Sequence, residues 1–381
     1  MKKKILVIIL LVLIIAVLLG IIFTKNNNNY QNNSQLEVSN YNYIPYSNEI
    51  TVVPTMFDTI TTNSSYCATF ELIWSDMKEE LVGQDIVFEP QEEMVINLNK
   101  GFFTKKMLSD KYYYNKIGVK SLKLKEEIET EIKNKFNQTS NVLDSFDWYG
   151  SSADQDNINT YIFYTMLYKE FQFLKEFQQF DPSTFGDDYE DIKYFGAEED
   201  SSRKIRRQIK VLYYNTYDDF AIILKTKSND ELIFVESPIG NTFKDIYENM
   251  NTKASVYKGK TKFTKYDYFM APELNIDITR EYNELENKLF NTKDGNAKIE
   301  KAIQTINFDL DSKGGKIKSE AAMGVTYYGE DEVVEEGRYF EVDDTFVIFL
   351  REKGKELPYF AARVEDITKF QNQELVFDDN F

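Results

Sequence analysis

The sequence of 381 residues has no histidine and only one cysteine, Cys67. Without histidine the chain cannot form Ser-His-Asp or Cys-His catalytic groups, HExxH zinc sites or histidine pH switches. A single cysteine excludes a disulfide within the chain, which is ordinary for a bacterial surface protein. The sequence also has no D-x-D-x-D-G calcium loop, so we expect no metal or organic cofactor.

Positive charge is also scarce. The 45 Lys and Arg residues stand against 63 Asp and Glu residues, which gives a formal net charge of −18. Such a chain repels polyanions, so the charge argues against nucleic acid as a partner and against a polybasic membrane patch. Aromatic residues are abundant, with 29 Phe and 26 Tyr, and 42% of the residues are hydrophobic. We therefore expect a sizeable core in one large domain or two smaller ones.

A long uncharged run lies at residues 5–23, directly after Met1-Lys2-Lys3-Lys4. Nineteen such residues are enough to cross a bilayer as a helix, and the lysines in front should stay in the cytoplasm. We expect residues 1–25 to be an uncleaved signal anchor that spans the cell membrane once; the alternative is a cleaved signal peptide. The Asn/Ser-rich residues 26–49 are then a flexible spacer, and residues 50–381 an extracellular domain.

Two segments of this domain have helical periodicity. Residues 66–81 place four large apolar side chains on one face and predict a core helix. Residues 115–136 carry charged residues at helical spacing and predict a single amphipathic helix with a solvated face.

The C-terminal third has the most distinctive pattern. Residues 315–327 alternate strictly between small or apolar residues and polar or tiny ones, as a strand does. Residues 329–337 follow with five acidic residues between two glycines, which predicts an exposed loop. Residues 345–350 and 357–361 are apolar runs joined by a polar turn, and they predict a buried β-hairpin.

This order resembles the C-terminal third of serpins. Ser319-Glu320-Ala321-Ala322 matches the family's hinge, and residues 340–346 match its "F-x-A-D-x-P-F" strand. Residues 357–364 match the end of the hairpin, "L-F-x-G-R-V". Thr345 and Ala362 stand where the family has proline and glycine.

The resemblance covers residues 159–364, so we divide the domain into a divergent part, residues 50–158, and a serpin-like part, residues 159–375. Phe180-Asp181-Pro182 resembles the family's "F-D-P", although the tryptophan and glycine of the preceding turn are missing. Gln304 stands where the family has a histidine that helps to hold the main sheet closed. Further matches are two strands at residues 210–224 and 232–236, a "V-P-K-F-x-I" strand at 271–276, a short helix at 282–290 and the strand before the hinge at 298–310.

The resemblance implies an α+β, serpin-like fold with mixed β-sheets, several helices and an exposed reactive-centre-like loop, preceded by the transmembrane helix. In serpins a target protease cuts this loop, which then inserts into the main sheet as an extra strand while the acyl-enzyme is distorted. The same resemblance assigns the hinge to Gly315, Ile317, Ser319, Glu320, Ala321, Ala322, Met323 and Val325.

Two alignments place the cut bond differently. Matching Gly314 with the family's hinge glycine gives Tyr328-Gly329, which we favour, and matching residues 319–322 gives Glu332-Val333. An aromatic residue before the cut suits a chymotrypsin-like or subtilisin-like serine protease, whereas a glutamate suits a glutamyl endopeptidase.

Three classes of function follow. The first is a membrane-anchored protease inhibitor whose partner is an extracellular serine protease. The second is a non-inhibitory surface binding protein with a serpin-like or unrelated fold. The third, which we do not favour, is an enzyme that works through carboxylates or a Ser-Lys pair, since histidine is absent.

Overall fold

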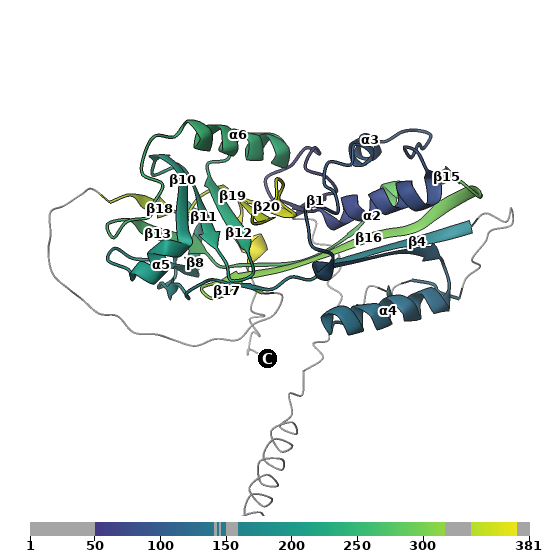
Figure 1. Ribbon diagram of the computed structural model, residues 1–381, viewed down its shortest axis with the longest axis horizontal. Coiled ribbons are helices and arrows are strands. Elements are labelled where there is room, and N and C mark those ends of the chain that lie inside the picture. The colour runs from purple at the N-terminus through teal and green to yellow at the C-terminus, as the bar shows by residue number, and fades with distance from the viewer. Residues whose placement is uncertain (1–49, 141–142, 145, 150–158, 317–336, 372–381) are drawn as a thin grey trace, which may run out of the picture. The chain divides into compact units, whose positions relative to one another are not determined.

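The computed structural model describes residues 50–140, 143–144, 146–149, 159–316 and 337–371 (Figure 1). The predicted signal anchor and spacer lie outside these residues. Within the described ranges no helix is both long and apolar enough to cross a membrane. The 1–25 transmembrane helix therefore stays a prediction.

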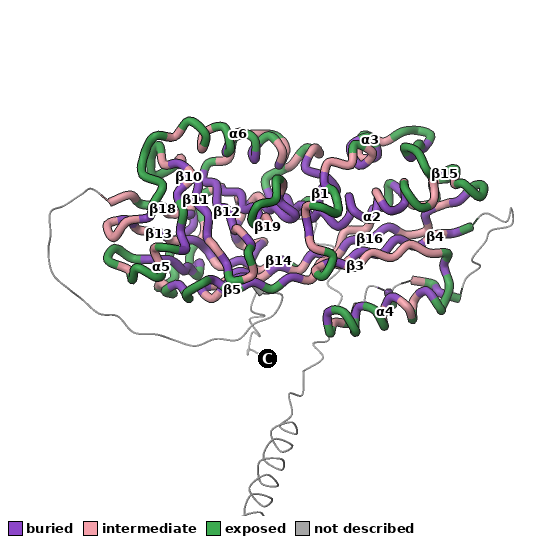
Figure 2. The backbone as a smooth tube through the Cα atoms, viewed as in Figure 1, coloured by how far each residue is buried: buried purple, intermediate pink, exposed green. Residues whose placement is uncertain are grey.

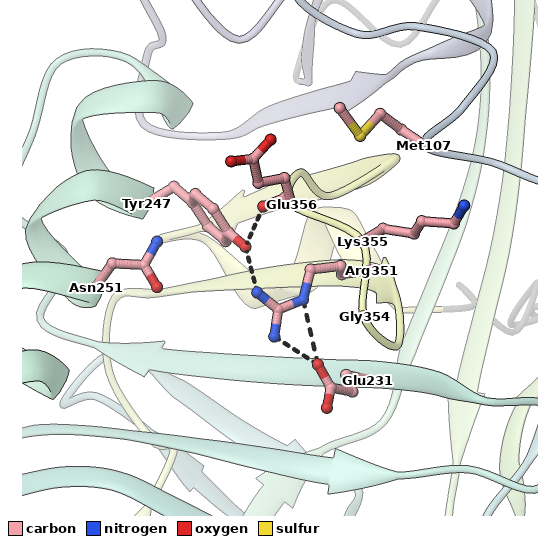
Figure 3. A pocket seen from close by; sticks show the side chains of 8 residues that line it. All are labelled: Met107, Glu231, Tyr247, Asn251, Arg351, Gly354, Lys355 and Glu356. Atoms are coloured by element: carbon pink, nitrogen blue, oxygen red, sulfur yellow. Dashed lines mark hydrogen bonds and ion pairs between the residues drawn. The ribbon is translucent and has the colours of Figure 1, made fainter.

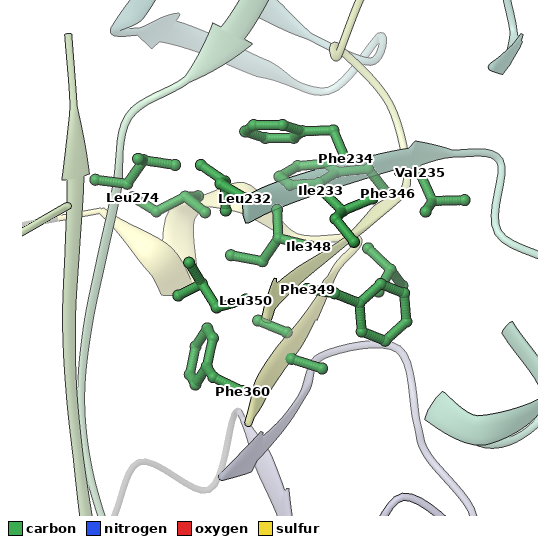
Figure 4. Close-up of a cluster of buried hydrophobic side chains, with 14 of the residues drawn as sticks. Leu232, Ile233, Phe234, Val235, Leu274, Phe346, Ile348, Phe349, Leu350 and Phe360 are labelled. Atoms are coloured by element: carbon green, nitrogen blue, oxygen red, sulfur yellow. The ribbon is translucent and has the colours of Figure 1, made fainter. Parts of the chain in front are cut away.

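Seven strands form the sheet at the centre of the apolar core, which we call the core sheet (Figure 4). Its inner strands are apolar at almost every position, and their side chains are buried on both faces. All neighbours are antiparallel except β1 and β2, which are parallel. In spatial order the strands are β1 (Thr51–Val53), β2 (Ser64–Cys67), β20 (Phe360–Val364), β19 (Phe346–Glu352), β12 (Asp230–Glu236), β11 (Asp219–Lys225) and β10 (Ile209–Thr216).

A second sheet, the long sheet, is built around the 17-residue strand β16. β16 pairs in parallel with β4 along one side and in antiparallel with β14 along the other. The strands are β3 (Tyr113–Val119), β4 (Asn159–Leu167), β16 (Gly295–Asp311), β17 (Gly314–Lys316) and β5 (Phe171–Gln172), with β14 (Leu274–Glu281) and β15 (Leu289–Thr292) also paired to β16.

Two helices cover opposite faces of the long sheet. α2 (Thr69–Met77), which a π-helical turn extends to Val82, packs Phe70, Ile73 and Trp74 against Phe163 of β4. α4 (Leu122–Phe136) packs its apolar stripe against Ile162 and Tyr164, which point to the other side of β4. Ser121 caps α4 by accepting a 3.1 Å hydrogen bond from the backbone N–H of Leu124.

The remaining elements are shorter. A third sheet has the order β18 (Tyr339–Glu341), β13 (Tyr268–Pro272), β9 (Tyr194–Ala197) and β6 (Gln178–Gln179), and β7 (Ser183–Phe185) pairs with β8 (Tyr189–Ile192). The other helices are α3 (Glu93–Asn99), α5 (Arg203–Gln208) and α6 (Phe243–Val256), with 3₁₀ turns at Asp110–Tyr112, Asn283–Leu285 and Ile367–Phe370. Buried residues gather in the core sheet and between the helices and the long sheet (Figure 2).

Three predicted segments are wrong in detail. Residues 115–136 are not one helix, because β3 takes the first part through its pairing with β4 and α4 begins only at Leu122. Residues 210–224 are not one strand, because a turn at residues 217–218 separates β10 from β11. Residues 282–290 contain a single 3₁₀ turn rather than a helix.

Candidate functional site

β17 is the described part of the predicted hinge, and it lies between two strands. On one side Gly315 pairs with Leu310 and Lys316 with Asp309 of β16, in antiparallel register. On the other side Gly315 pairs with Phe171 of β5. The chain that leaves β16 has therefore turned back and begun a new strand in the long sheet.

The two glycines at the start of β17 are required by close approach to β5. A Cβ on Gly314 would lie 2.3 Å from the carbonyl oxygen of Phe171, and Gly314 has a φ of +150°, which other residues rarely adopt. A Cβ on Gly315 would lie 2.1 Å from the Phe171 ring. Only a chain without side chains at both positions can enter the sheet here.

Of the predicted hinge residues, Gly315 alone is described, as a buried residue of β17. The others, namely Ile317, Ser319, Glu320, Ala321, Ala322, Met323 and Val325, lie outside the described residues. The predicted cleavage residues Tyr328 and Gly329, or Glu332 and Val333, lie there as well.

A small cavity of about 20 Å³ lies where β4 and β16 stop pairing. The last pair between the two strands is Met166 with Thr305, and β17 begins its pairing at Asp309. The walls are mainly apolar and come from both strands and from the core sheet behind them. They are Cys67, Leu167, Lys169, Phe171, Ile306, Asn307, Phe308, Leu350, Tyr359 and Phe360.

Lys169 is the charged residue in this wall, and it is 5% exposed. Its ammonium lies 2.7 Å from Oδ1 of Asp230 and 2.8 Å from Oε1 of Glu352. It also lies 3.9 Å from the ring centroid of Tyr112 and 4.7 Å from that of Tyr359. Burial raises the pKa of Asp230, and the neighbouring Lys169 partly opposes this change.

Gln304 occupies the next buried layer below the cavity. Its amide donates hydrogen bonds to the carbonyl of Cys67 (2.8 Å) and to Oγ1 of Thr69 (3.0 Å), and its carbonyl accepts one from Tyr282 (2.8 Å). The hydroxyl of Thr165, its register partner in β4, lies 2.8 Å from its acceptor Oδ1 of Asn115 and 3.4 Å from the carbonyl oxygen of Thr69. Thr69 at the start of α2 therefore joins the side chains of the two parallel strands.

Glu71 of α2 is a buried carboxyl beside the same layer. It accepts hydrogen bonds from the hydroxyl of Tyr66 (2.9 Å) and the backbone N–H of Phe103 (3.0 Å). Burial raises the pKa of Glu71 to about 7, which the two hydrogen bonds only partly offset.

A separate pocket of about 660 Å³ opens between α6 and the β19–β20 turn (Figure 3). Arg351 crosses its floor, where the guanidinium donates to Oε2 of Glu231 and, at 2.7 Å, to the hydroxyl of Tyr247. Asn251, Lys355, Glu356, Met107 and Gly354 complete the lining. The pocket thus offers groups of both charge signs beside a methionine.

The sequence analysis did not find the cluster of Lys169, Asp230 and Glu352. Its three members lie far apart in the sequence, and only the packing of the core sheet against the end of β4 brings them together. The available signal was one lysine inside an aromatic run, Tyr168 to Phe173.

No family model matches the chain, and no curated protein matches it. Solved structures that are similar to the chain are serpins. Human thyroxine-binding globulin, complexed with its hormone, is 12% identical, with 80% of this chain and 92% of that chain covered and a TM-score of 0.45. Serpin48 of the insect Tenebrio molitor is 12% identical, with 80% of this chain and 92% of that chain covered and a TM-score of 0.46. The thermophilic serpin tengpin in its native state is 12% identical, with 74% of this chain and 70% of that chain covered and a TM-score of 0.38.

The described residues hold the order of elements that the sequence resemblance implies. In chain order these elements are the strand pair β11 and β12, a strand that ends at Pro272, the long strand β16, the short strand β17 at the start of the predicted hinge, and the C-terminal hairpin β19–β20. The described residues form an α+β fold of mixed sheets and several helices, which is similar to the fold of these serpins. The likeness is one of fold, and nothing in it shows an enzyme.

Proposed function

We propose that the chain is a membrane-anchored extracellular protein that inhibits a serine protease by inserting its cut loop between β4 and β16. The observation that supports this proposal is the register of β17. If the register of β17 continued along β16, Ser319 would lie opposite Ile306, and if it continued along β5, Ser319 would lie opposite Leu167. Ile306 and Leu167 follow directly on the last β4–β16 pair, so both continuations reach the same row of the sheet.

The agreement persists further along the strands. Ala321 would lie between Gln304 and Thr165, and these two residues are already partners. Met323 would lie between Ala302 and Phe163, which are partners as well. The large side chain of Met323 could hinder insertion by steric clash. It would lie opposite Ala302, the smallest side chain of that row, which reduces this clash.

The alternation also fits the two faces of the sheet. Gly315 faces the core, so the odd-numbered hinge residues would face the core and the even-numbered ones the side of α4. Ala322 and Gly324 would then lie beside Tyr164 and Ile162, where α4 covers the sheet and small residues are needed.

Inhibition would follow from this insertion. A protease that cuts at Tyr328-Gly329, or at Glu332-Val333, forms an acyl-enzyme on the loop before water releases it. Insertion moves that ester away from its initial place and distorts it, so that hydrolysis slows. New backbone hydrogen bonds and newly buried side chains would supply the driving force.

A second candidate function is non-inhibitory binding. The observation that favours it is the pocket between α6 and the β19–β20 turn, whose volume suits a small ligand and whose polar groups converge on Arg351. In that case the loop would be cut without insertion.

The test mixes the full chain in mild detergent with chymotrypsin-like, subtilisin-like and glutamyl-specific proteases. We expect a denaturant-resistant complex of summed mass, and a large rise in Tm of chain cut between residues 326 and 338. Ala321→Asp, which places a charge opposite Gln304, should abolish both without changing the Tm of uncut chain. Clean cutting of wild-type chain with neither complex nor rise would leave only the binding function.

A further inference from the structure

We propose that the helix α5 and its surroundings form a docking surface for an acidic surface on the target protease. We call this surface the α5 patch; it consists of the basic residues of α5 together with Lys175, Lys225 and Lys227. The inference rests on the proposed function, because it names the charge of the partner that the inhibitor would bind.

Arginine is rare in this chain, and its distribution is uneven. The sequence has seven arginines, and three of them, Arg203, Arg206 and Arg207, lie in the six-residue helix α5. The other four each form an ion pair with a carboxylate; they are Arg280, Arg338, Arg351 and Arg363. Within the described ranges no carboxylate forms an ion pair with an arginine of α5. The arginines without an acidic partner are thus gathered on one helix.

α5 carries its positive charges at a cost to its own stability. Arg203 lies three residues before Arg206 and four before Arg207, so like charges are neighbours on the helix surface. Arg203 and Lys204 also lie in the first turn, where the helix dipole disfavours positive charge. Local choices that oppose the fold in this way are expected at functional sites, where a contact outside the chain accounts for them.

Three lysines from neighbouring turns extend the positive surface. Lys175 is fixed beside α5, because its backbone exchanges two hydrogen bonds with the side chain of Gln208, at 2.8 and 2.7 Å. The ammonium of Lys225 donates to the carbonyl of Arg207 at 3.3 Å, and the exposed Lys227 follows two residues later. None of these three lysines forms an ion pair with another residue that the structure describes. The patch therefore concentrates positive charge in a chain whose net charge is −18.

The α5 patch lies beside both described ends of the predicted reactive loop. At one end Lys227 donates to Oε1 of Gln172 at 3.0 Å, and Gln172 pairs with Gly314 of β17. At the other end Glu199, just before α5, accepts a 2.7 Å hydrogen bond from the hydroxyl of Tyr339 in β18. Figure 1 shows α5, β17 and β18 in the same half of the molecule. A protease that binds the loop would therefore lie close to the patch.

The chemistry of the patch identifies what this protease must carry. Guanidinium groups bind carboxylates through paired hydrogen bonds, and an excess of positive charge attracts a negative surface over a long range. Leu174, next to Lys175, is 50% exposed and offers an apolar contact that a protein surface can cover. Glu176, on the other side of Lys175, is also exposed and would repel a uniform polyanion. The partner surface is therefore one of Asp and Glu side chains on a folded protein.

The experiment measures the rate constant for cutting of the loop in the full chain in mild detergent. The proteases are chymotrypsin and chymotrypsin whose lysines have been succinylated, which makes the same enzyme acidic. One variant combines Arg203→Gln, Lys204→Gln and Arg207→Gln. The acidic protease should cut wild-type chain about tenfold faster than this variant at low ionic strength, and the ratio should be much smaller for unmodified chymotrypsin. The ratio should fall toward one at 1 M salt, where the Debye length is about 3 Å.

The matched control combines Lys123→Gln, Lys133→Gln and Lys135→Gln, which remove the same charge from exposed positions of α4. This control should be cut like wild type. Because the α5 substitutions remove repulsion, the Tm of the uncut variant should not fall. The single change Arg203→Glu reverses one charge and should slow the acidic protease in the same direction, which keeps the test decisive if the triple variant does not fold.

The outcomes separate this inference from the proposed function. Equal cutting of wild type and the α5 variant by the acidic protease would overturn the inference, whereas a denaturant-resistant complex in the same mixtures would show that the proposed function stands. Faster cutting of wild type with neither complex nor rise in Tm would support the docking surface and overturn inhibition. Equal cutting together with weaker binding of the variant to vesicles of anionic lipid would assign the patch to a membrane and overturn the inference.

Discussion

The core sheet and the long sheet are both largely buried, yet their sequences are built differently. In the core sheet β12 and β19 are apolar on both faces, and Ile233, Phe234 and Ile348 are fully buried. In the long sheet β16 alternates between buried and half-buried residues, and polar side chains such as Gln304 and Thr165 lie inside (Figure 2). Neighbouring inner strands of the core sheet contact each other mainly through apolar side chains, whereas β4 and β16 also contact the start of α2 through the polar side chains of Thr165 and Gln304.

This difference shows where the fold can change its strand order. Separating β12 from β19 would expose large apolar side chains on two faces at once, which is prohibitively costly. Separating β4 from β16 would also uncover apolar side chains such as Ile162 and Phe163, but a newly inserted strand could cover these side chains again and satisfy the same backbone groups. Three predictions test the contrast, from the largest expected effect to the smallest.

Phe349→Ala and Phe308→Ala compare the same truncation in the two sheets. Phe349 is fully buried in the core sheet, so its loss should lower the free energy of unfolding by about 3 to 5 kcal/mol. Phe308 already borders the cavity, so its loss should cost less, about 2 to 3 kcal/mol. Urea unfolding of both variants measures the difference; equal losses would mean that the long sheet is as tightly packed as the core sheet.

Glu71→Gln tests the buried carboxyl under the long sheet by its pH dependence. The pKa of Glu71 is raised to about 7 in the folded chain, so the folded state holds the proton more tightly than the unfolded state. The contribution of Glu71 to the free energy of unfolding is complete below the unfolded pKa of about 4.3. Up to about 3 kcal/mol of this contribution is lost as the pH rises to 7. Unfolding at several pH values should show this loss in wild type and a flatter profile in Glu71→Gln.

Gln304→Ala and Gln208→Ala compare two buried glutamines. Each leaves hydrogen-bonding groups without a partner, so each should cost about 1 to 3 kcal/mol. Gln208 bonds only to the backbone of Lys175, whereas Gln304 helps to join β16 to α2. Only Gln304→Ala should therefore also speed the rise in Tm after the loop is cut. A similar change in Gln208→Ala would show that general destabilisation is responsible.

The sequence predicted the strongly patterned elements best. The apolar runs at residues 345–350 and 357–361 are β19 and β20 within a few residues, because burial on both faces demands continuous apolar sequence. The helix expected at residues 66–81 is present as α2 and its π-helical extension. β3 was missed because its polar residues fit a helical pattern, and only pairing with the distant β4 makes it a strand.

The turn between β10 and β11 was missed for a local reason, since Tyr217-Asp218 contains neither glycine nor proline. For the candidate functional site, too, only part of the arrangement could be predicted from the sequence. The sequence analysis placed Gly314 and Gly315 at the start of the predicted hinge, and the structure shows that both lie too close to Phe171 to carry a side chain. The cavity and the Lys169 cluster could not, because their residues come from β4, β12, β16 and β19 and meet only in the folded chain.

The β-bulge in β16 limits the length over which an inserted strand could keep its pairing register. Pairing between β4 and β16 is regular from Thr305 down to Lys301 and then shifts by one residue before Ile299. An inserted strand could keep both of its registers from Ile317 to Gly324, which would face Lys301, and would then meet the irregularity. At about 3.4 Å per residue, this run spans roughly 27 Å. The register that supports insertion therefore covers this length of the long sheet and ends at the bulge.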